Sequence, residues 1–282
     1  MIDFKLSNGV EIPAMGYGVF QMSSAEVAEH LPQAIQAGFR HIDTANGYYN
    51  EVAVGEAVRE SGIPRSEFFI TTKLWPRDYG TADCMAAIDA SLDRLGTDYI
   101  DLLLLHQPYG PYTEAWKVME EALAAGKVRA IGLSNFPREK FQEVLDVADV
   151  TPQVLQVELN PRCNQHVLKE WLAPLGVVFE GWYPLGHGDA ELLKLPPIVA
   201  AAEAHGVEPA QVCLRWSIQE GNVVFPKTCN PEHMRQNLAV LDFALTDEEM
   251  AAIDAIPQAP YYVVPDEAPA FIDQMPPFDQ QM

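Results

Sequence analysis

Eight apolar, strand-like segments alternate with helix-like segments along this chain, and this alternation constrains the fold more than any other feature. The strand-like segments are 15–20, 39–42, 68–73, 99–105, 128–133, 153–158, 177–182 and 222–226. Helical patterns run from Ser23 or Ser24 to Gly38 and over 50–61, 81–95, 113–126, 138–148, 165–175, 197–205, 209–219 and 231–240. Apolar strands joined through helices form parallel sheets that are covered on both faces. Eight such units in 282 residues predict a closed (β/α)₈ TIM barrel rather than an open doubly wound sheet.

Length, net charge and cysteine spacing limit the number of domains, the kinds of partner and the compartment that we expect for this protein. The length suits a single barrel domain over residues 1–282. A net charge of −22 argues against nucleic acid or an anionic membrane as a partner, and no apolar run is long enough to cross a bilayer. The start lacks the pattern of a secretory signal, and four widely spaced cysteines are typical of free thiols in a reducing compartment. We expect a cytoplasmic monomer or weak dimer with a small-molecule partner.

The two ends of the chain differ from the repeated units. Residues 4–12 alternate apolar and polar side chains around Asn8-Gly9, which predicts a β-hairpin with a two-residue turn that plugs the bottom of the barrel. Residues 257–282 contain six prolines and little periodicity. One interpretation is a frayed terminus. The other is a loop over the barrel mouth, because the aromatic side chains there are poorly suited to a solvated tail.

Four side chains with complementary proton chemistry follow successive strands. Asp43 and Tyr48 follow strand 39–42, Lys73 ends the next strand, and His106 follows the strand after that. Parallel strands bring their carboxyl ends to one face, so these groups are expected to meet. Lys73 and Asp43 could form a purely structural ion pair, and His106 could be a core histidine. Taken together the four favour catalysis, with the ammonium of Lys73 expected to lower the pKa of Tyr48 from about 10.

Other strand ends offer groups suited to a bound ring and an anion. The hydrogen-bonding side chains are Ser134, Asn135, Gln156 and Glu158, and the flat indole is Trp182. Lys227 and Thr228 come next, and Asn230 and Pro231 then begin a helix whose free N–H groups suit a phosphate. A ring and a phosphate together suggest a cofactor site. It is not a Rossmann dinucleotide site, because Gly16-Tyr17-Gly18 lacks the third glycine of that motif. His205 and His233 lack partners at metal-ligand spacing, so we expect no metal.

These residues resemble the motifs of the aldo-keto reductase family over essentially the whole chain, and prokaryotic, diketogluconate-reductase-like members in particular. The matching stretches, in family order, are 38–45 with Glu51 and Gly55, 72–75, 105–108, 131–136 and 225–228. The short loop between His106 and Trp116 also resembles prokaryotic members.

The resemblance implies the reduction of an aldehyde or ketone, with NADP(H), and also NAD(H), bound across the barrel mouth. Tyr48 would donate the proton, Lys73 and Asp43 would assist it, and His106 would orient the carbonyl. The implied cofactor contacts are Gly18, Ser134, Asn135, Gln156, Trp182, Leu185, Lys227, Thr228, His233, Gln236 and Asn237. The implied substrate contacts are Phe20, Trp75 and Gln107.

The sequence departs from the commoner family pattern at four positions: Gln107, Leu155, His233 and Gln236. Gln107 replaces a frequent tryptophan and makes one wall of the pocket smaller and more polar. His233 stands where NADPH-preferring members usually have arginine, and a histidine is a weaker partner for a phosphate at neutral pH. We therefore expect a preference for NADPH with measurable NADH activity.

Two other function classes compete with carbonyl reduction. A cofactor-binding regulatory or interaction protein on the same fold would need no proton donor, so the set Asp43, Tyr48, Lys73 and His106 argues against it. A barrel hydrolase would need metal ligands or paired catalytic acids, which the sequence does not offer.

Overall fold

The computed structural model describes residues 2–276 and 278, apart from the side chains of residues 81 and 82. The strands are β1 (Asp3–Lys5), β2 (Glu11–Pro13), β3 (Gly16–Gly18), β4 (His41–Asp43), β5 (Phe69–Leu74), β6 (Ile100–Leu105), β7 (Val128–Ser134), β8 (Val154–Glu158), β9 (Val178–Trp182) and β10 (Val223–Val224). Strands β3 to β10 form one parallel sheet in chain order. A parallel bridge between Met15 and Val224 joins the two outer strands, with the Val224 N–H donating to Ala14 O at 3.0 Å. Eight parallel strands thus form a nearly closed barrel, which confirms the predicted fold.

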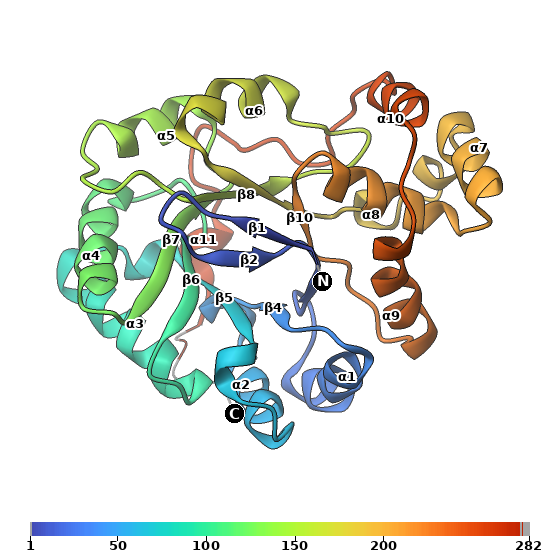
Figure 1. The fold of residues 1–282 in the computed structure, drawn as a ribbon. Coiled ribbons are helices and arrows are strands. Elements are labelled where there is room, and N and C mark those ends of the chain that lie inside the picture. Colours follow the sequence, from blue (N-terminus) through green and yellow to red (C-terminus); the bar gives the residue numbers. More distant parts are fainter. Residues whose placement is uncertain (1, 277, 279–282) are drawn as a thin grey trace.

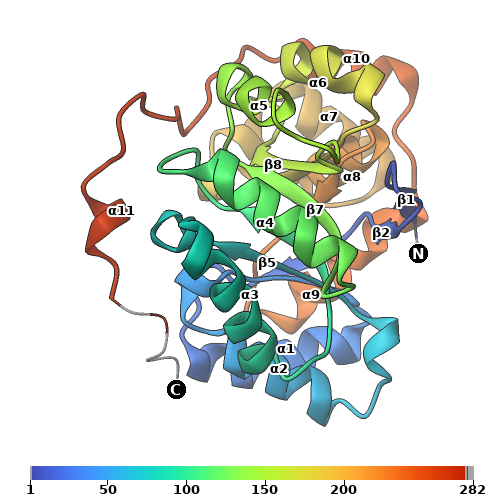
Figure 2. The ribbon, with the colours of Figure 1, turned by 90° about the vertical axis from the view of Figure 1, so that its left-hand side faces the viewer.

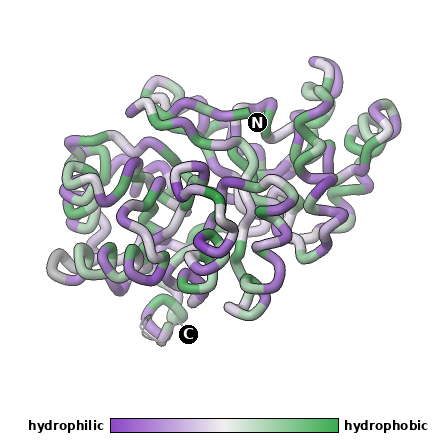
Figure 3. Tube along the Cα trace, turned by 60° about the horizontal axis from the view of Figure 1, so that its bottom comes forward, coloured by the Kyte–Doolittle hydropathy of each residue, from purple (hydrophilic) through white to green (hydrophobic). Residues whose placement is uncertain are grey.

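Helices surround the barrel (Figure 1). They are α1 (Ser24–Ala37), α2 (Glu51–Glu60), α3 (Thr81–Leu95), α4 (Tyr112–Ala124), α5 (Arg138–Leu145), α6 (His166–Leu172), α7 (Pro196–His205), α8 (Pro209–Gln219), α9 (Pro231–Leu238) and α10 (Asp247–Asp254). A short further helix, α11 (Phe271–Gln274), belongs to the tail. In Figure 3 hydrophobic and hydrophilic residues alternate along most helices, as burial of one face requires. None of the helices within the described residues combines the length and apolarity needed to span a membrane.

Local sequence explains where α1 begins and ends. Ser23 is its N-cap and forms a capping box with Glu26, as predicted for Ser23 or Ser24. Gly38 ends the helix with a φ of 121°, a conformation that residues with a Cβ rarely adopt. The chain then enters β4, which covers residues 41–43 rather than the predicted 39–42. Helix α10 was not predicted from the sequence, although Thr246 and Glu249 form a capping box at its start.

The hairpin of β1 and β2 plugs the bottom of the barrel (Figure 1). Leu6 and Ile12 are buried in one cluster with inward-facing barrel residues such as Leu102 and Leu104, which confirms the predicted plug. The predicted two-residue turn is wrong. Lys5 pairs with Glu11, the Leu6 N–H donates to Val10 O, and the Gly9 N–H donates to Leu6 O. The loop is therefore residues 7–9, and a φ of 88° at Gly9 provides the left-handed residue that this longer turn needs.

The proline-rich tail lies on the opposite side of the molecule from the hairpin (Figure 2). Three of its backbone oxygens accept hydrogen bonds from aromatic side chains of the barrel loops: Ile272 O from Trp75 at 2.9 Å, Pro276 O from Tyr49 at 2.7 Å and Pro265 O from Tyr109 at 2.9 Å. Ile272 and Phe278 are buried against Trp75 and Tyr109. The tail therefore lies over the barrel mouth, and it is not a frayed end over the described residues. Residues 277 and 279–282 of the predicted tail lie outside them.

Candidate active site

A cavity of about 720 Å³ opens at the carboxyl ends of the barrel strands. Thirteen of the predicted site residues line it: Gly18, Phe20, Asp43, Tyr48, Trp75, His106, Gln107, Ser134, Asn135, Gln156, Trp182, Leu185 and Lys227. They come from most of the barrel strands or from the loops that follow them. The predicted residues that do not line it are Lys73, Glu158, Thr228, Asn230, Pro231, His233, Gln236 and Asn237.

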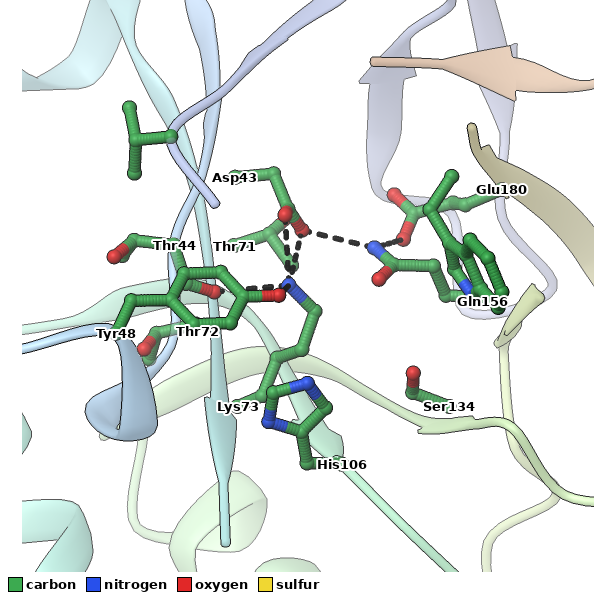
Figure 4. Close-up of polar contacts among 12 residues, drawn as sticks. Asp43, Thr44, Tyr48, Thr71, Thr72, Lys73, His106, Ser134, Gln156 and Glu180 are labelled. Atoms are coloured by element: carbon green, nitrogen blue, oxygen red, sulfur yellow. Dashed lines mark hydrogen bonds and ion pairs between the residues drawn. The ribbon is translucent and has the colours of Figure 1, made fainter. Parts of the chain in front are cut away.

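Lys73 is fully buried behind the cavity wall and makes a dense set of contacts (Figure 4). Its Nζ donates to the two carboxylate oxygens of Asp43 at 2.7 and 2.8 Å and to Thr44 O at 3.0 Å. It also donates to the phenol oxygen of Tyr48 at 3.3 Å. The ion pair that the sequence suggested is present, and it leaves the ammonium in contact with the phenol at the cavity surface.

The expected lowering of the pKa of Tyr48 is wrong. Burial raises the pKa of the Tyr48 phenol to about 12, because desolvation penalises the phenolate more than the ammonium of Lys73 favours it, and Asp43 adds to the rise. The ammonium of Lys73 still lowers the pKa of Tyr48, but by less than burial raises it. Tyr48 is therefore a protonated phenol at neutral pH, which is the form that a proton donor requires.

His106 stands beside the phenol. Its ring centroid is 5.5 Å from that of Tyr48 and 5.0 Å from that of Trp75, both in edge-to-face arrangements. Burial and the nearby ammonium of Lys73 hold the pKa of His106 well below its usual value, so the imidazole is neutral. Its buried Nδ1 has no hydrogen-bond partner among the described residues. A neutral imidazole can donate one hydrogen bond without adding charge.

Ser134, Asn135 and Trp182 form a second polar group along the wall. Asn135 has a φ of 65°, which is uncommon for a residue with a Cβ and is often found at functional sites. Its Nδ2 donates to His106 O at 3.2 Å and to Ser134 Oγ at 3.3 Å. Its Oδ1 accepts from the indole N–H of Trp182 at 3.0 Å, which fixes the orientation of that ring.

Gln156 connects this wall to the Asp43 carboxylate. Its Nε2 donates to Asp43 Oδ2 at 2.8 Å and to Glu180 Oε2 at 2.9 Å (Figure 4). Glu180, a fully buried carboxyl in β9, was not predicted as a site residue. A signal was available, because an acid at this position interrupts an otherwise apolar strand. Burial raises the pKa of Glu180 to about 8, with the Asp43 charge as the second cause.

The residues expected around a phosphate lie past the rim of the cavity. Lys227 is exposed at its edge, Asn230 caps α9 by accepting from the Glu232 N–H, and His233 is exposed on that helix. Thr228 Oγ1 accepts from the Asn230 N–H at 3.0 Å and lies 3.5 Å from His233 Nδ1.

One end of the cavity is largely aromatic. Phe20 and Trp75, the expected substrate contacts, line it, with Phe20 packed against the Tyr48 ring at 5.0 Å between centroids. Gln107 also lines it, and its buried Oε1 has no hydrogen-bond partner among the described residues. The tail adds wall residues that the sequence analysis placed only in a general lid: Tyr261, Tyr262, Phe271 and Met275. Tyr183 and His187, from the loop after β9, also line the cavity. They were not predicted, because no sequence motif marks them as site residues.

One group of possible metal ligands occurs among the described residues, away from this cavity. It comprises His166, Glu220 and Asp254. Its carboxylates already have partners, because Lys169 donates to Glu220 at 3.1 Å and Trp216 donates to Asp254 at 2.8 Å. The cluster is thus a set of internal ion pairs and hydrogen bonds.

Comparisons with known proteins identify the family of the chain. A protein-family model described as "Aldo/keto reductase family" matches residues 14–258. A protein named morphine 6-dehydrogenase from Pseudomonas putida is 44% identical over 265 residues, covering 89% of this chain and 90% of that protein. A protein named 9,11-endoperoxide prostaglandin H2 reductase from Trypanosoma cruzi is 42% identical over 254 residues, covering 89% and 90%.

Solved structures give the same result. An aldo/keto reductase from Brucella melitensis has a TM-score of 0.86 and 39% identity, covering 90% of this chain and 98% of that chain. The aldose reductase from Schistosoma japonicum has a TM-score of 0.88 and 30% identity, covering 93% and 94%. The chain therefore belongs to the aldo/keto reductase family, and this membership makes it an oxidoreductase.

Proposed function

We propose that this protein reduces aldehydes or ketones to alcohols with a nicotinamide cofactor, and that Tyr48 is the proton donor. The observation that carries the proposal is the hydrogen bond from Lys73 Nζ to the phenol oxygen of Tyr48. Because that oxygen accepts from the ammonium, the phenol proton is left for another acceptor. Tyr48 lines the cavity, so a substrate carbonyl oxygen is the acceptor that fits.

The family generally uses nicotinamide cofactors, and the side chains of the cavity fit such a group. Trp182 offers a flat aromatic face whose orientation is fixed by Asn135. Gln156 uses its Nε2 on two carboxyls, which leaves its amide oxygen as an acceptor for a carboxamide N–H. Ser134 and Asn135 lie on the same wall and add further polar atoms. When bound, the cofactor supplies a hydride to the carbonyl carbon.

The chain's own groups then handle the proton and the developing charge. Tyr48 gives its proton to the carbonyl oxygen, and the ammonium of Lys73 stabilises the phenolate that remains. Asp43 keeps Lys73 charged within the buried site, since an ammonium without a partner would lose its proton there. His106, neutral and beside Tyr48, donates a hydrogen bond that orients the carbonyl.

The cofactor preference is proposed to be NADPH over NADH. Lys227 lines the rim of the cavity, and α9 directs its N-terminus, capped by Asn230, toward the region past Thr228. A cation and a helix N-terminus both favour a 2′-phosphate. His233 is exposed in the first turn of α9 and is a weaker phosphate partner than an arginine would be, so NADH should also be used.

The test is turnover of 4-nitrobenzaldehyde, followed by loss of NADPH absorbance, with wild type and Tyr48→Phe compared in parallel. Turnover by wild type that the variant lacks supports the proposal. Tight NADPH binding without turnover of any aldehyde, ketone, ketoacid or sugar in a panel would instead favour a cofactor-binding regulatory protein. The panel should include prostaglandin H2, and oxidation of morphine with NADP+ should be assayed in the reverse direction, because two relatives carry those names.

A further inference from the structure

Glu180 is a buried acid to which the proposed chemistry gives no role. It lies on β9 directly beside Gln156 of β8, since the two are partners in the parallel register, and Gln156 is in turn the partner of Ser134 on β7. The Glu180 side chain is completely inaccessible to solvent. Burying a carboxyl is costly, so an acid at a strand position that an aliphatic residue could fill needs a reason.

The reason lies in the amide of Gln156. An amide nitrogen has two N–H groups, and here one is directed to Asp43 Oδ2 and the other to Glu180 Oε2. Asp43 is ion-paired with Lys73, so only the N–H end of the amide can face it. Glu180 accepts the second N–H and thereby fixes the plane of the amide. Figure 4 shows the amide nitrogen between the two carboxyl groups and the amide oxygen turned away from both.

We propose that Glu180 is a positioning residue: it holds the Gln156 amide so that its oxygen faces the cavity and accepts a hydrogen bond from the carboxamide N–H of the nicotinamide. This inference rests on the proposed function. Glu180 does not touch the cofactor in this scheme. It acts through Gln156, and its loss leaves one amide N–H without an acceptor and the amide free to rotate.

The charge state of Glu180 agrees with this role. Burial raises its pKa to about 8, so the carboxyl keeps its proton at neutral pH. Oε2 accepts from Gln156, and Oε1 lies 3.9 Å from His41 Nε2 and has no hydrogen-bond partner among the described residues. A neutral acceptor orients Gln156 without adding a second negative charge beside Asp43. Glutamine at position 180 can do the same.

The experiment compares two reduced cofactors by the quenching of tryptophan fluorescence. One is NADPH, and the other is its 3-acetylpyridine analogue, which keeps the carbonyl but has no amide N–H. Wild type should bind NADPH about fivefold to tenfold more tightly than the analogue, the range expected for one hydrogen bond. In Glu180→Met, which has similar length and no acceptor, the two dissociation constants should agree within about twofold. Glu180→Gln should restore the wild-type ratio.

Controls separate positioning from folding. Asp101→Asn alters another fully buried carboxylate, held by Arg65 and Arg129 outside the cavity lining, so it should lower stability and leave the cofactor ratio unchanged. Glu180→Leu replaces Glu180→Met if the latter fails to fold. If neither variant folds, Glu180→Gln provides the test. Equal dissociation constants of that variant for NADPH and the analogue would overturn the inference.

The outcomes distinguish this inference from the proposed function. An unchanged ratio in Glu180→Met shows that Glu180 has only a structural role. Equal and tight binding of both cofactors to wild type shows that Gln156 does not contact the carboxamide, which overturns the inference and leaves carbonyl reduction standing. A wild type that neither binds NADPH nor reduces 4-nitrobenzaldehyde overturns the proposed function itself.

Discussion

The ammonium nitrogen of Lys73 lies 3.3 Å from the phenol oxygen of Tyr48 and 4.9 Å from the centre of its ring. The three N–H groups of this ammonium are directed to the Asp43 carboxylate, to Thr44 O and to the phenol oxygen. Lys73 therefore acts as a fixed donor and Tyr48 as an acceptor. The phenol proton is therefore left for another acceptor.

Tyr48→Phe removes the only side chain that we assign as proton donor. We expect kcat to fall by at least about two orders of magnitude, in line with the loss of general-acid catalysis. The dissociation constant of NADPH should change by less than about twofold, because the substitution removes one oxygen and keeps the ring. Steady-state kinetics and cofactor titration check both. Near-normal reduction by the variant would remove Tyr48 from this role.

Asp43→Asn leaves the ammonium of Lys73 buried without its counterion. Breaking a buried ion pair on one side costs about 3 to 5 kcal/mol, so the variant should unfold at a markedly lower urea concentration. The matched control is Asp189→Asn, which breaks a partly exposed pair with Arg162 and should cost less than about 1 kcal/mol. Equal losses in the two variants would show that burial of the Lys73 pair adds nothing.

Deletion of residues 266–282 removes the part of the tail that contributes Phe271 and Met275 to the cavity. Residues 277 and 279–282 of this deletion lie outside the described part of the chain. We expect KM and kcat to change more for bulky carbonyl compounds than for small aldehydes, because the lost side chains line the aromatic end of the cavity. The dissociation constant of NADPH should stay within about threefold of wild type. Identical kinetics across a substrate panel would show that the tail has no part in substrate binding.

His233→Arg places a permanent cation in the first turn of α9. We expect NADPH to bind more tightly by on the order of 1 kcal/mol, the value of one charge-assisted contact with a 2′-phosphate, and NADH binding to be almost unchanged. Arg235→Gln is the control, because Arg235 is already paired with Glu232. An equal shift for both cofactors, or a wild type without NADH turnover, would show that His233 does not face the phosphate.

Glu180→Gln should change how stability depends on pH. The folded protein keeps the Glu180 proton up to a pKa of about 8, whereas the unfolded chain loses it near 4.5. The stabilising contribution of this raised pKa is therefore fully present below about pH 4.5 and is lost as pH rises toward 8. The groups facing Glu180 are Asp43, Lys73 and His41.

The variant has no proton to lose at this position. The difference in unfolding free energy between the variant and wild type should therefore shift in favour of the variant by roughly 3 kcal/mol from pH 5 to pH 8, at about 1.4 kcal/mol per pKa unit. Urea unfolding of both proteins at the two pH values measures the change, and any constant effect of the substitution cancels. Parallel pH profiles would mean that Glu180 is ionised in the folded protein throughout this range.

Local sequence patterns were enough to predict the barrel and the meeting of Asp43, Tyr48, Lys73 and His106. The periodicity that distinguishes strands from helices is local, and parallel strands joined by helices must end on the same face, so a motif placed after a strand is also placed in space. Helix capping is local as well, which is why the cap could be narrowed to Ser23 or Ser24, of which the structure shows Ser23. The hairpin turn failed because two-residue and three-residue loops share the Asn8-Gly9 signal, and the pairing of Lys5 with Glu11 decides between them.

Features that depend on neighbours from distant parts of the chain could not be predicted from local patterns. Glu180 lies 24 residues from Gln156 in sequence, and only the register of β8 and β9 brings their side chains within hydrogen-bond distance. The pKa of Tyr48 moved opposite to the expectation because desolvation is set by everything packed around the phenol, whereas the sequence shows only the nearby cation. The tail carries no periodic pattern, so its place over the barrel mouth follows from its contacts with Trp75 and Tyr109, which belong to loops more than 150 residues earlier.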